Sequence, residues 1–221
     1  MLLDVLAADP AAPTTVREPS QAVDVHLADS LSALELPVVL EARRIIDIGA
    51  GPGFPGLALA AASPQARVRL IDSVAKKCDF MVRAAARAGL SNVEVTHIRA
   101  EILGVEPPSA DLVTARAVGR LAMVEEYAAP LLIVGGHLVA WAGRRDAEEE
   151  ADAASAAEDL GLDLVEVRSV SPFAAARHRH LHVYRKAAAT PDRFPRRPGI
   201  AHKRAREWSR ARKQGATFRT R

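Results

Sequence analysis

The chain has 221 residues, of which 49% are apolar and 26% are charged, and its net charge is +3. This composition is typical of a globular protein and excludes disordered, collagen-like and disulfide-rich classes. The chain has one cysteine, Cys78, so it can form no internal disulfide. A helix that spans a membrane needs about 20 apolar residues, and no apolar run in the sequence is that long. We therefore expect a cytoplasmic protein with no membrane partner, and a monomer.

Strand-like and helix-like segments alternate from residue 44 onwards. β-branched and apolar runs predict strands over residues 44–48, 68–72, 93–98, 111–115, 137–141, 162–170 and 180–186. Helical spacing predicts helices over residues 54–62, 74–88, 121–129 and 145–160. Ser73 is the expected N-cap of the second helix, and Gly135-Gly136 the expected turn before the fifth strand. The alternation predicts a mostly parallel sheet with helices on both faces, ending in an antiparallel pair.

The strongest local signal is the loop Asp47-Ile-Gly-Ala-Gly-Pro-Gly-Phe-Pro-Gly56, directly after the first predicted strand. Its glycines let the backbone turn tightly and approach a ligand closely. The segment from Gly51 to Gly56 fits the G-x-G-x-x-G pattern of dinucleotide-binding proteins. Asp72 follows Gly51 by 21 residues, where an acid that binds a ribose is expected. An NAD-dependent enzyme is therefore one alternative, and a loop with no ligand is another.

Three features favour S-adenosylmethionine (SAM) over a dinucleotide. A pyrophosphate needs free backbone N–H groups at the start of a helix, and Pro52 and Pro55 each remove one. The carboxylate of Asp47 suits a cofactor that carries an ammonium and a sulfonium group, whereas it repels a pyrophosphate. Arg99-Ala-Glu101, after the third predicted strand, supplies a recognition segment that dinucleotide binding does not require.

Together with other motifs, the glycine-rich loop makes the chain resemble a known family, the bacterial 16S ribosomal RNA (guanine-N7) methyltransferase G family, also called glucose-inhibited division protein B. The resemblance extends from about residue 14 to residue 204. The matching motifs are His26-Leu-Ala-Asp-Ser-Leu31, the glycine-rich loop, Leu70-Ile-Asp-Ser73, Ser91-Asn-Val-Glu94, Arg99-Ala-Glu101, Thr114-Ala-Arg-Ala117, Arg179-His-Leu181 and Thr190-Pro-Asp-Arg-Phe-Pro-Arg-Arg-Pro-Gly199.

The resemblance implies an α/β, Rossmann-like class I SAM-dependent methyltransferase with a seven-stranded, mostly parallel sheet whose last strand is antiparallel. It implies methylation of guanine N7 in 16S ribosomal RNA, so that the partner is this RNA or the small ribosomal subunit. No catalytic side chain is assigned, because N7 has a free lone pair and no proton to lose. The implied cofactor contacts are Gly49, Phe54, Ala100, Glu101 and Arg116, with Asp72 on the ribose and Asp47 near the methionine end, and Gly51 and Gly53 are added for the shape of the loop.

Charge is concentrated at the end of the chain. Residues 186–221 contain 12 basic residues (Lys and Arg) and 2 acidic residues. The other 185 residues contain 18 basic and 25 acidic residues. A basic segment on an acidic body is typical of phosphate binding, although a solvated tail with no partner is the alternative. The expected RNA contacts are Arg193, Arg196, Arg197, Lys203 and Arg204, with Trp208 stacking on bases. Deletion of residues 193–221 is expected to weaken RNA binding and to leave SAM affinity nearly unchanged.

The expected division of the chain is a shortened N-terminal cap (residues 1–40), a SAM-binding domain (41–186) and a basic tail (187–221). Ala142 stands where the family commonly has a lysine. Two alternatives remain: a SAM methyltransferase with another RNA, protein or small-molecule substrate, and a non-catalytic RNA-binding protein that keeps the fold. His178, His180 and His182 share one face of a predicted strand, but without nearby carboxylates or cysteines no metal site is expected.

Overall fold

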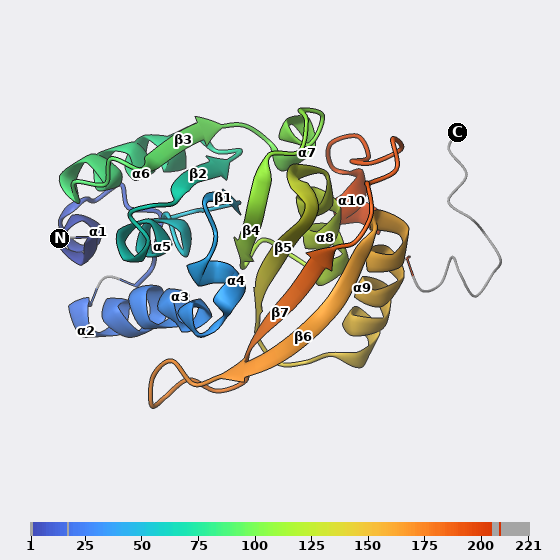
Figure 1. Ribbon diagram of the computed structural model, residues 1–221. Helices are drawn as coiled ribbons and strands as arrows, with labels where there is room; N and C mark the ends of the chain where they lie inside the picture. Colours follow the sequence, from blue (N-terminus) through green and yellow to red (C-terminus); the bar gives the residue numbers. More distant parts are fainter. Residues whose placement is uncertain (1, 17, 205–207, 209–221) are drawn as a thin grey trace.

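A seven-stranded sheet forms the centre of the protein (Figure 1). The computed structural model describes residues 2–16, 18–204 and 208. In spatial order the strands are β3 (Val93–His97), β2 (Arg67–Asp72), β1 (Arg44–Ile48), β4 (Ala110–Arg116), β5 (Leu132–Ala142), β7 (Arg179–Lys186) and β6 (Leu162–Val170). Neighbouring strands from β3 to β5 are parallel, whereas β7 is antiparallel to both β5 and β6. The mostly parallel sheet with an antiparallel last strand is confirmed.

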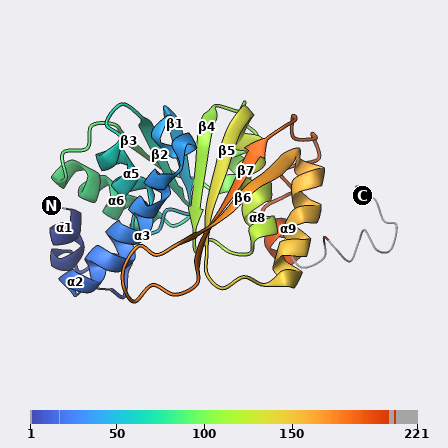
Figure 2. The same ribbon diagram turned by 60° about the horizontal axis from the view of Figure 1, so that its bottom comes forward.

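Helices cover both faces of this sheet, which Figure 2 shows between its two helical layers. The first face carries α1 (Leu2–Ala8), α3 (Asp29–Leu31), α4 (Pro37–Leu40), α5 (Gly56–Ala62) and α6 (Ala75–Arg87). The second face carries α7 (Ala100–Leu103), α8 (Leu121–Ala128), α9 (Ala147–Leu160) and α10 (Ile200–Arg204). Within the described ranges, no helix is long and apolar enough to cross a bilayer.

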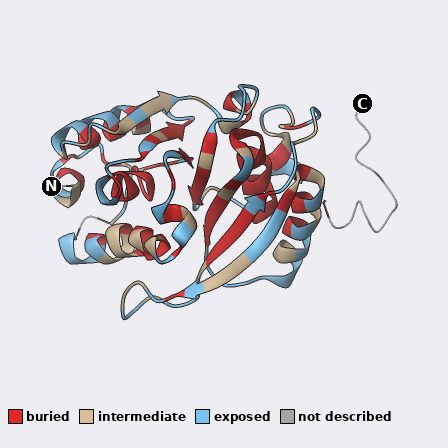
Figure 3. Ribbon diagram, in the orientation of Figure 1, coloured by how far each residue is buried: buried red, intermediate tan, exposed pale blue. Residues whose placement is uncertain are grey.

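Alternate residues of the strands supply two separate hydrophobic cores. In β1, Ile45 belongs to the core of the first face, and Ile46 and Ile48 belong to the core of the second. Strand side chains point alternately to opposite faces, so Asp47 projects towards the first face, on which α5 lies. Figure 3 shows the central strands buried along most of their length, whereas residues in the middle of the edge strand β6 are partly or fully exposed.

The N-terminal segment is fastened to the body by polar contacts. Asp9, which follows α1, accepts a hydrogen bond from Arg83 Nη2 of α6 at 2.9 Å. Next come α2 (Pro19–Ala22) and a π-helical segment, η1 (Val23–Ala28). Arg116, at the end of β4, donates to Val25 O at 2.8 Å, and Trp141 of β5 donates its Nε1–H to Asp29 O at 2.8 Å. These bonds hold η1 and α3 beside the ends of β4 and β5.

Two local expectations from the sequence were wrong. Helix α6 begins after Val74, and no side chain caps it, so Ser73 is not its N-cap. Strand β5 begins at Leu132 and includes Gly135 and Gly136. Its register with β4 shifts between Ala110 and Leu112, so the two glycines lie in an irregularity of the strand and not in a turn before it.

Candidate functional site

The glycine-rich loop between β1 and α5 lies where the parallel strands end, beside the point at which strand order reverses between β1 and β4. Gly49, Gly51 and Gly53 have φ angles of +63°, +58° and +93°, a region that favours glycine. A Cβ at Gly49 would lie 2.9 Å from Val118, and one at Gly53 would lie 2.3 Å from Leu57. Both backbone conformation and close packing therefore require glycine here.

From residue 50 to residue 56, the loop uses all of its backbone N–H groups inside the protein. Ala50 donates to Ile71 O at 3.1 Å, Gly51 to Asp72 Oδ2 at 3.0 Å, and Gly56 to Asp47 Oδ2 at 2.9 Å. Gly53 and Phe54 both donate to Ala50 O, and the two prolines have no N–H. A pyrophosphate would find no free donor in this segment, which argues against the dinucleotide alternative.

Asp47 lies beneath the loop and has no exposed surface. Its Oδ2 accepts the Gly56 N–H, and its Oδ1 accepts the Thr114 hydroxyl at 2.8 Å. Burial raises the pKa of Asp47 to about 7, although the two hydrogen bonds oppose this shift. The expected contact between Asp47 and the methionine end of a cofactor is therefore corrected: its carboxylate joins β1, β4 and the start of α5.

Beside the loop lies the first cleft, a cavity of about 310 Å³. Its walls come from the ends of β1, β2 and β4, the loop after β3, and helices α7 and α8, and they include Ile48, Gly49, Ile71, Asp72, Ile98, Ala100, Glu101, Val118, Met123 and Tyr127. Asp72 is 5% exposed, and its two oxygens accept the N–H groups of Gly51 and Val74. The cleft thus combines apolar walls with two carboxylates, Asp72 and Glu101, each of which is paired with a cation in the lining, Lys77 and Arg99 respectively.

Glu101 is buried, and one of its carboxylate oxygens accepts three hydrogen bonds. Oε1 accepts hydrogen bonds from Arg99 Nη2 at 2.9 Å, the Tyr127 hydroxyl at 3.2 Å and the Gly199 N–H at 3.1 Å. Burial by itself raises the pKa of this carboxyl, but the hydrogen bonds and the Arg99 charge outweigh burial and lower it. A negative charge therefore persists in the wall of the first cleft.

The second cleft, of about 490 Å³, adjoins the first and shares Gly49, Lys77 and Ala117 with it. Phe54, Arg116, Asp29, Trp141 and Arg179 are among its lining residues. Arg116 Nη1 lies 2.9 Å from Asp29 Oδ2. The other oxygen, Oδ1, is buried and has no hydrogen-bond donor among the described residues, with Arg179 Nε at 3.6 Å. This cleft therefore offers an aromatic ring, a guanidinium and an unsatisfied carboxylate oxygen.

His26 of η1 packs against Phe54 in the second cleft, with ring centroids 5.0 Å apart and planes 15° from parallel. Its Nε2 lies 3.0 Å from Thr14 Oγ1, and its Nδ1 lies 3.5 Å from Arg116 Nη2. Burial and the Arg116 charge lower the pKa of His26 to about 4. The ring is therefore neutral at pH 7, and because arginine can only donate, its proton lies on Nε2, facing Thr14.

Comparison with known proteins places this geometry in a family. Residues 11–181 match the family model described as rRNA small subunit methyltransferase G. This chain belongs to that family. It is 36% identical over 194 residues to the ribosomal RNA small subunit methyltransferase G of Desulfitobacterium hafniense, covering 86% of this chain and 80% of that protein. The corresponding protein of Pelotomaculum thermopropionicum is 39% identical over 183 residues, covering 81% of this chain and 76% of that protein.

Solved structures agree on the fold. A SAM-dependent methyltransferase from Aquifex aeolicus has a TM-score of 0.58 at 18% identity and covers 84% of this chain and 97% of its own. The chain therefore has the class I SAM-dependent methyltransferase fold, and the sequence resemblance to methyltransferase G is confirmed. In the described part of the chain, no three His, Cys, Asp or Glu side chains gather as metal ligands.

Most residues that the family resemblance singled out converge on the two clefts. Gly49, Asp72, Ala100 and Glu101 line the first, and Gly49, Gly51, Phe54 and Arg116 line the second. Gly53 lines neither and instead packs against Leu57. Phe54 is 3% exposed and is held between its neighbours.

The described part of the basic tail packs on the body. Arg193 and Arg197 are exposed, as is Lys203. Arg196 differs, because its side chain is 13% exposed and forms an ion pair with the fully buried Glu126 of α8. Arg196 is therefore removed from the expected RNA contacts. Trp208 is 1% exposed and stacks on Phe194, so the expectation that it stacks on bases is also wrong. The side chain of Arg204 and residues 209–221 lie outside the described residues.

Several cleft residues were not found by sequence reasoning. Ala117 lines both clefts with φ at +57°, which is uncommon for a residue other than glycine. Its places after the predicted strand end and in the family motif Thr114-Ala-Arg-Ala117 were the available signals. Lys77, Tyr127 and Trp141 lie in helices or strands that were predicted. Their spacing in the sequence does not show that their side chains line a cleft beside the glycine-rich loop. His202, in the basic tail, also lines the first cleft.

Proposed function

We propose that this protein transfers a methyl group from SAM to N7 of a guanine in 16S ribosomal RNA of the small ribosomal subunit. Membership of the methyltransferase G family and two adjoining clefts at the ends of the parallel strands support this proposal. A ribosomal RNA substrate would require the protein to act in the cytoplasm. One copy of the chain supplies all the residues that line the two clefts, which is consistent with action as a monomer.

The first cleft fits SAM better than it fits a phosphate-bearing cofactor. The adjoining loop segment has no free N–H group for a phosphate, and the cleft itself carries the carboxylates of Asp72 and Glu101. Carboxylates accept hydrogen bonds from ribose hydroxyls, and Lys77 and Arg99 balance the charges of these two. SAM would supply a methyl group bound to a positively charged sulfur. Gly49, Asp72, Ala100 and Glu101 would hold it, with Ile71, Ile98 and Val118 as the apolar walls.

The second cleft fits a single guanine base. Phe54 is 3% exposed, with His26 stacked on it and the guanidinium carbon of Arg116 6.0 Å from the centre of its ring, so it shapes the wall of this cleft and holds Arg116 in place. Asp29 Oδ1 is buried, has no hydrogen bond from the described residues and lies 3.6 Å from Arg179 Nε; the N1–H and exocyclic amine of guanine could donate to it once Arg179 moves aside. In A-form RNA, N7 faces a deep and narrow groove, so the target guanine must be exposed or extruded before it enters this cleft.

The residues of the second cleft account for catalysis by position and charge. Guanine N7 needs no general base, so the requirement is to hold N7 against the methyl donor and to exclude water. The purine becomes positively charged as N7 is methylated. The Asp29 carboxylate is paired with both Arg116 and Arg179, and its negative charge offsets part of the positive charge that surrounds the purine. His26, neutral and stacked on Phe54, keeps the ring in place without adding positive charge beside the substrate.

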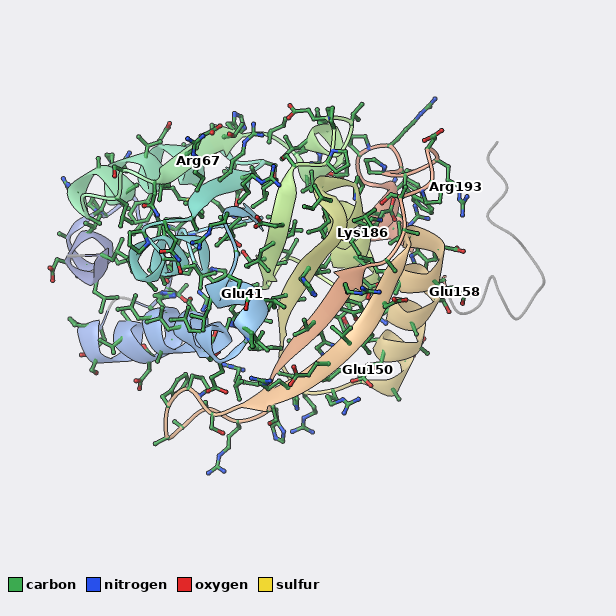
Figure 4. The ribbon with its side chains drawn as sticks, in the orientation of Figure 1. Glu41, Arg67, Glu150, Glu158, Lys186 and Arg193 are labelled. Carbon is green, nitrogen blue, oxygen red and sulfur yellow. The ribbon has the colours of Figure 1, made fainter. Side chains whose placement is uncertain are left out.

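Contacts to RNA phosphates are proposed at exposed basic residues around the clefts. Arg193, Arg197 and Lys203 belong to the tail, and Arg144 follows β5 near the second cleft. Figure 4 labels Arg193 in the loop beyond β7 and Lys186 at the end of that strand. Lys186 Nζ is buried and donates to Leu160 O and to the Thr190 hydroxyl, which fixes the point where the tail leaves the sheet.

The test is transfer of a labelled methyl group to small ribosomal subunits that lack this modification, followed by mapping of the label. We expect label at N7 of one guanine in 16S RNA. The variant Asp29→Asn keeps the size of the side chain and removes its charge, and it should lower the rate by about ten- to a hundredfold if a charged hydrogen bond to guanine is lost. Label on protein, on another RNA or on free nucleosides, or at another atom, would contradict the proposal.

A further inference from the structure

The segment from Phe194 to Arg204 packs beside the first cleft. Phe194 stacks on Trp208 with ring centroids 5.8 Å apart, and both side chains are buried. The backbone N–H of Arg196 donates to Glu126 Oε1 at 3.0 Å, in addition to the side-chain ion pair. Ala201 of α10 is fully buried in the core of the second face. These contacts fix the segment on α8.

Helix α8 links this segment to the first cleft. Glu126 faces the tail, whereas Met123 and Tyr127 of the same helix line the cleft. Glu101 also lines the cleft, and its Oε1 accepts hydrogen bonds from the Tyr127 hydroxyl and the Gly199 N–H. Gly199 has φ at +82°, which favours glycine at the point where the backbone turns towards Glu101. A shift of residues 199–202 would therefore remove a donor from a buried carboxylate in the cleft wall.

His202 completes this wall. It lies in α10, three residues after Gly199, and lines the first cleft together with Ala100, Glu101 and Tyr127. We propose that residues 199–202 form part of the cofactor site, with the His202 ring contacting bound SAM, so that RNA binding by the basic tail and SAM binding support each other. This inference rests on the proposed use of SAM.

The inference reverses an expectation from the sequence. A tail that only contacted RNA could be deleted without loss of SAM affinity. Because Gly199 and His202 belong to the wall of the first cleft, deletion should weaken SAM binding as well as RNA binding. Coupling is reciprocal for binding free energies, so SAM must strengthen RNA binding by the same factor by which RNA strengthens SAM binding.

The first experiment measures SAM affinity by titration calorimetry for the full chain, for His202→Ala and for the matched control His178→Ala. His178 is an exposed histidine before β7 that lines neither cleft. We expect His202→Ala to weaken SAM binding about three- to tenfold, the range for one ring contact, and the control to bind as the unchanged chain does. Equal affinities for all three proteins would overturn the assignment of His202.

The outcome for the unchanged chain separates this inference from the proposed function. Absence of SAM binding by the unchanged chain would refute the proposed cofactor. SAM binding that His202→Ala leaves intact would refute only the role of the tail. A chain that ends at residue 198 should lose at least as much affinity as His202→Ala, and its circular dichroism spectrum shows whether it folds.

The second experiment measures binding of a 16S RNA fragment with and without S-adenosylhomocysteine, which cannot donate a methyl group. In the unchanged chain, the ligand should raise RNA affinity several-fold, by the coupling factor. In His202→Ala the factor should fall towards one. An RNA affinity that does not respond to the ligand in the unchanged chain would overturn the coupling.

Discussion

Asp47 Oδ2 accepts the backbone N–H of Gly56 at 2.9 Å, which joins the end of β1 to the first residue of α5. The same carboxylate accepts the Thr114 hydroxyl from β4 through its other oxygen. One buried side chain thus closes the glycine-rich loop and fixes it against the neighbouring strand. The shape of the first cleft depends on this bond, because Gly49 and Asp72 line that cleft on either side of the loop.

We predict that Asp47→Ala lowers the free energy of unfolding by about 2–4 kcal/mol, because two buried donors lose their acceptor. Urea unfolding followed by circular dichroism measures this change. Thr114→Val is the control, since it removes one donor and leaves the Gly56 bond in place, and it should cost about 1 kcal/mol. Equal losses in the two variants would contradict the role assigned to Asp47.

Asp72→Asn should weaken SAM binding by about ten- to a hundredfold, the effect of losing one charged hydrogen bond. The amide keeps one oxygen, which can accept the Gly51 N–H, whereas the Val74 N–H just before α6 then loses its acceptor. Titration calorimetry gives the affinity, and thermal unfolding without ligand provides the control for the fold. Unchanged affinity would exclude Asp72 from the cofactor site.

His26 should make the protein less stable as pH falls from about 6.5 to 4. Its pKa is about 4 in the folded protein, against 6.5 for a histidine in water, so the unfolded chain takes up a proton first. The contribution is fully present above pH 6.5 and is lost progressively below it, by at most roughly 3 kcal/mol. His26→Gln keeps a donor and an acceptor but does not titrate, so its stability should change less over this range.

Comparison of His26→Gln with the unchanged chain at each pH isolates the effect of His26. Asp47 acts in the opposite direction, because its pKa is raised from 3.8 to about 7 and its contribution to stability falls as pH rises through that range. Asp47 is present in both proteins and cancels in the difference. Parallel curves of unfolding free energy against pH would refute the assignment to His26.

Arginines of the tail should fall into two groups. Arg196→Met should lower the free energy of unfolding by about 3–5 kcal/mol, because it leaves the Glu126 carboxylate buried and unpaired. The double variant Arg196→Met with Glu126→Leu should recover most of this loss. Failure of the second substitution to restore stability would contradict the importance of this ion pair.

Arg193→Ala with Arg197→Ala should leave stability nearly unchanged, because both side chains are exposed. RNA binding should weaken, and the magnitude of the slope of log affinity against log salt should fall by about 1.4–1.8, since two phosphate contacts are lost. Fluorescence anisotropy with an RNA fragment at several salt concentrations measures both quantities. An unchanged slope would remove these two residues from the RNA-binding surface.

The order along the chain of the seven strands and of α5, α6, α8 and α9, the position of the glycine-rich loop and its unsuitability for pyrophosphate could be predicted from the amino-acid sequence, whereas the short helices α7 and α10 and those before β1 were not predicted. These features depend on local chemistry: side-chain periodicity, glycine at positive φ, and proline without an N–H. The family could also be recognised from the sequence, because its motifs are contiguous segments of the chain.

Which polar side chains face the clefts depended instead on tertiary packing. Asp47 and Asp72 both end strands beside the loop, yet Asp47 is enclosed beneath it and Asp72 lines the first cleft. Arg196 and Glu126 are 70 residues apart, and Gly199 and Glu101 are 98 residues apart. Sequence spacing carries no information about such pairs. Their contact depends on how α8 and the tail pack on the second face of the sheet, where burial makes an unpaired charge too costly to leave without a partner.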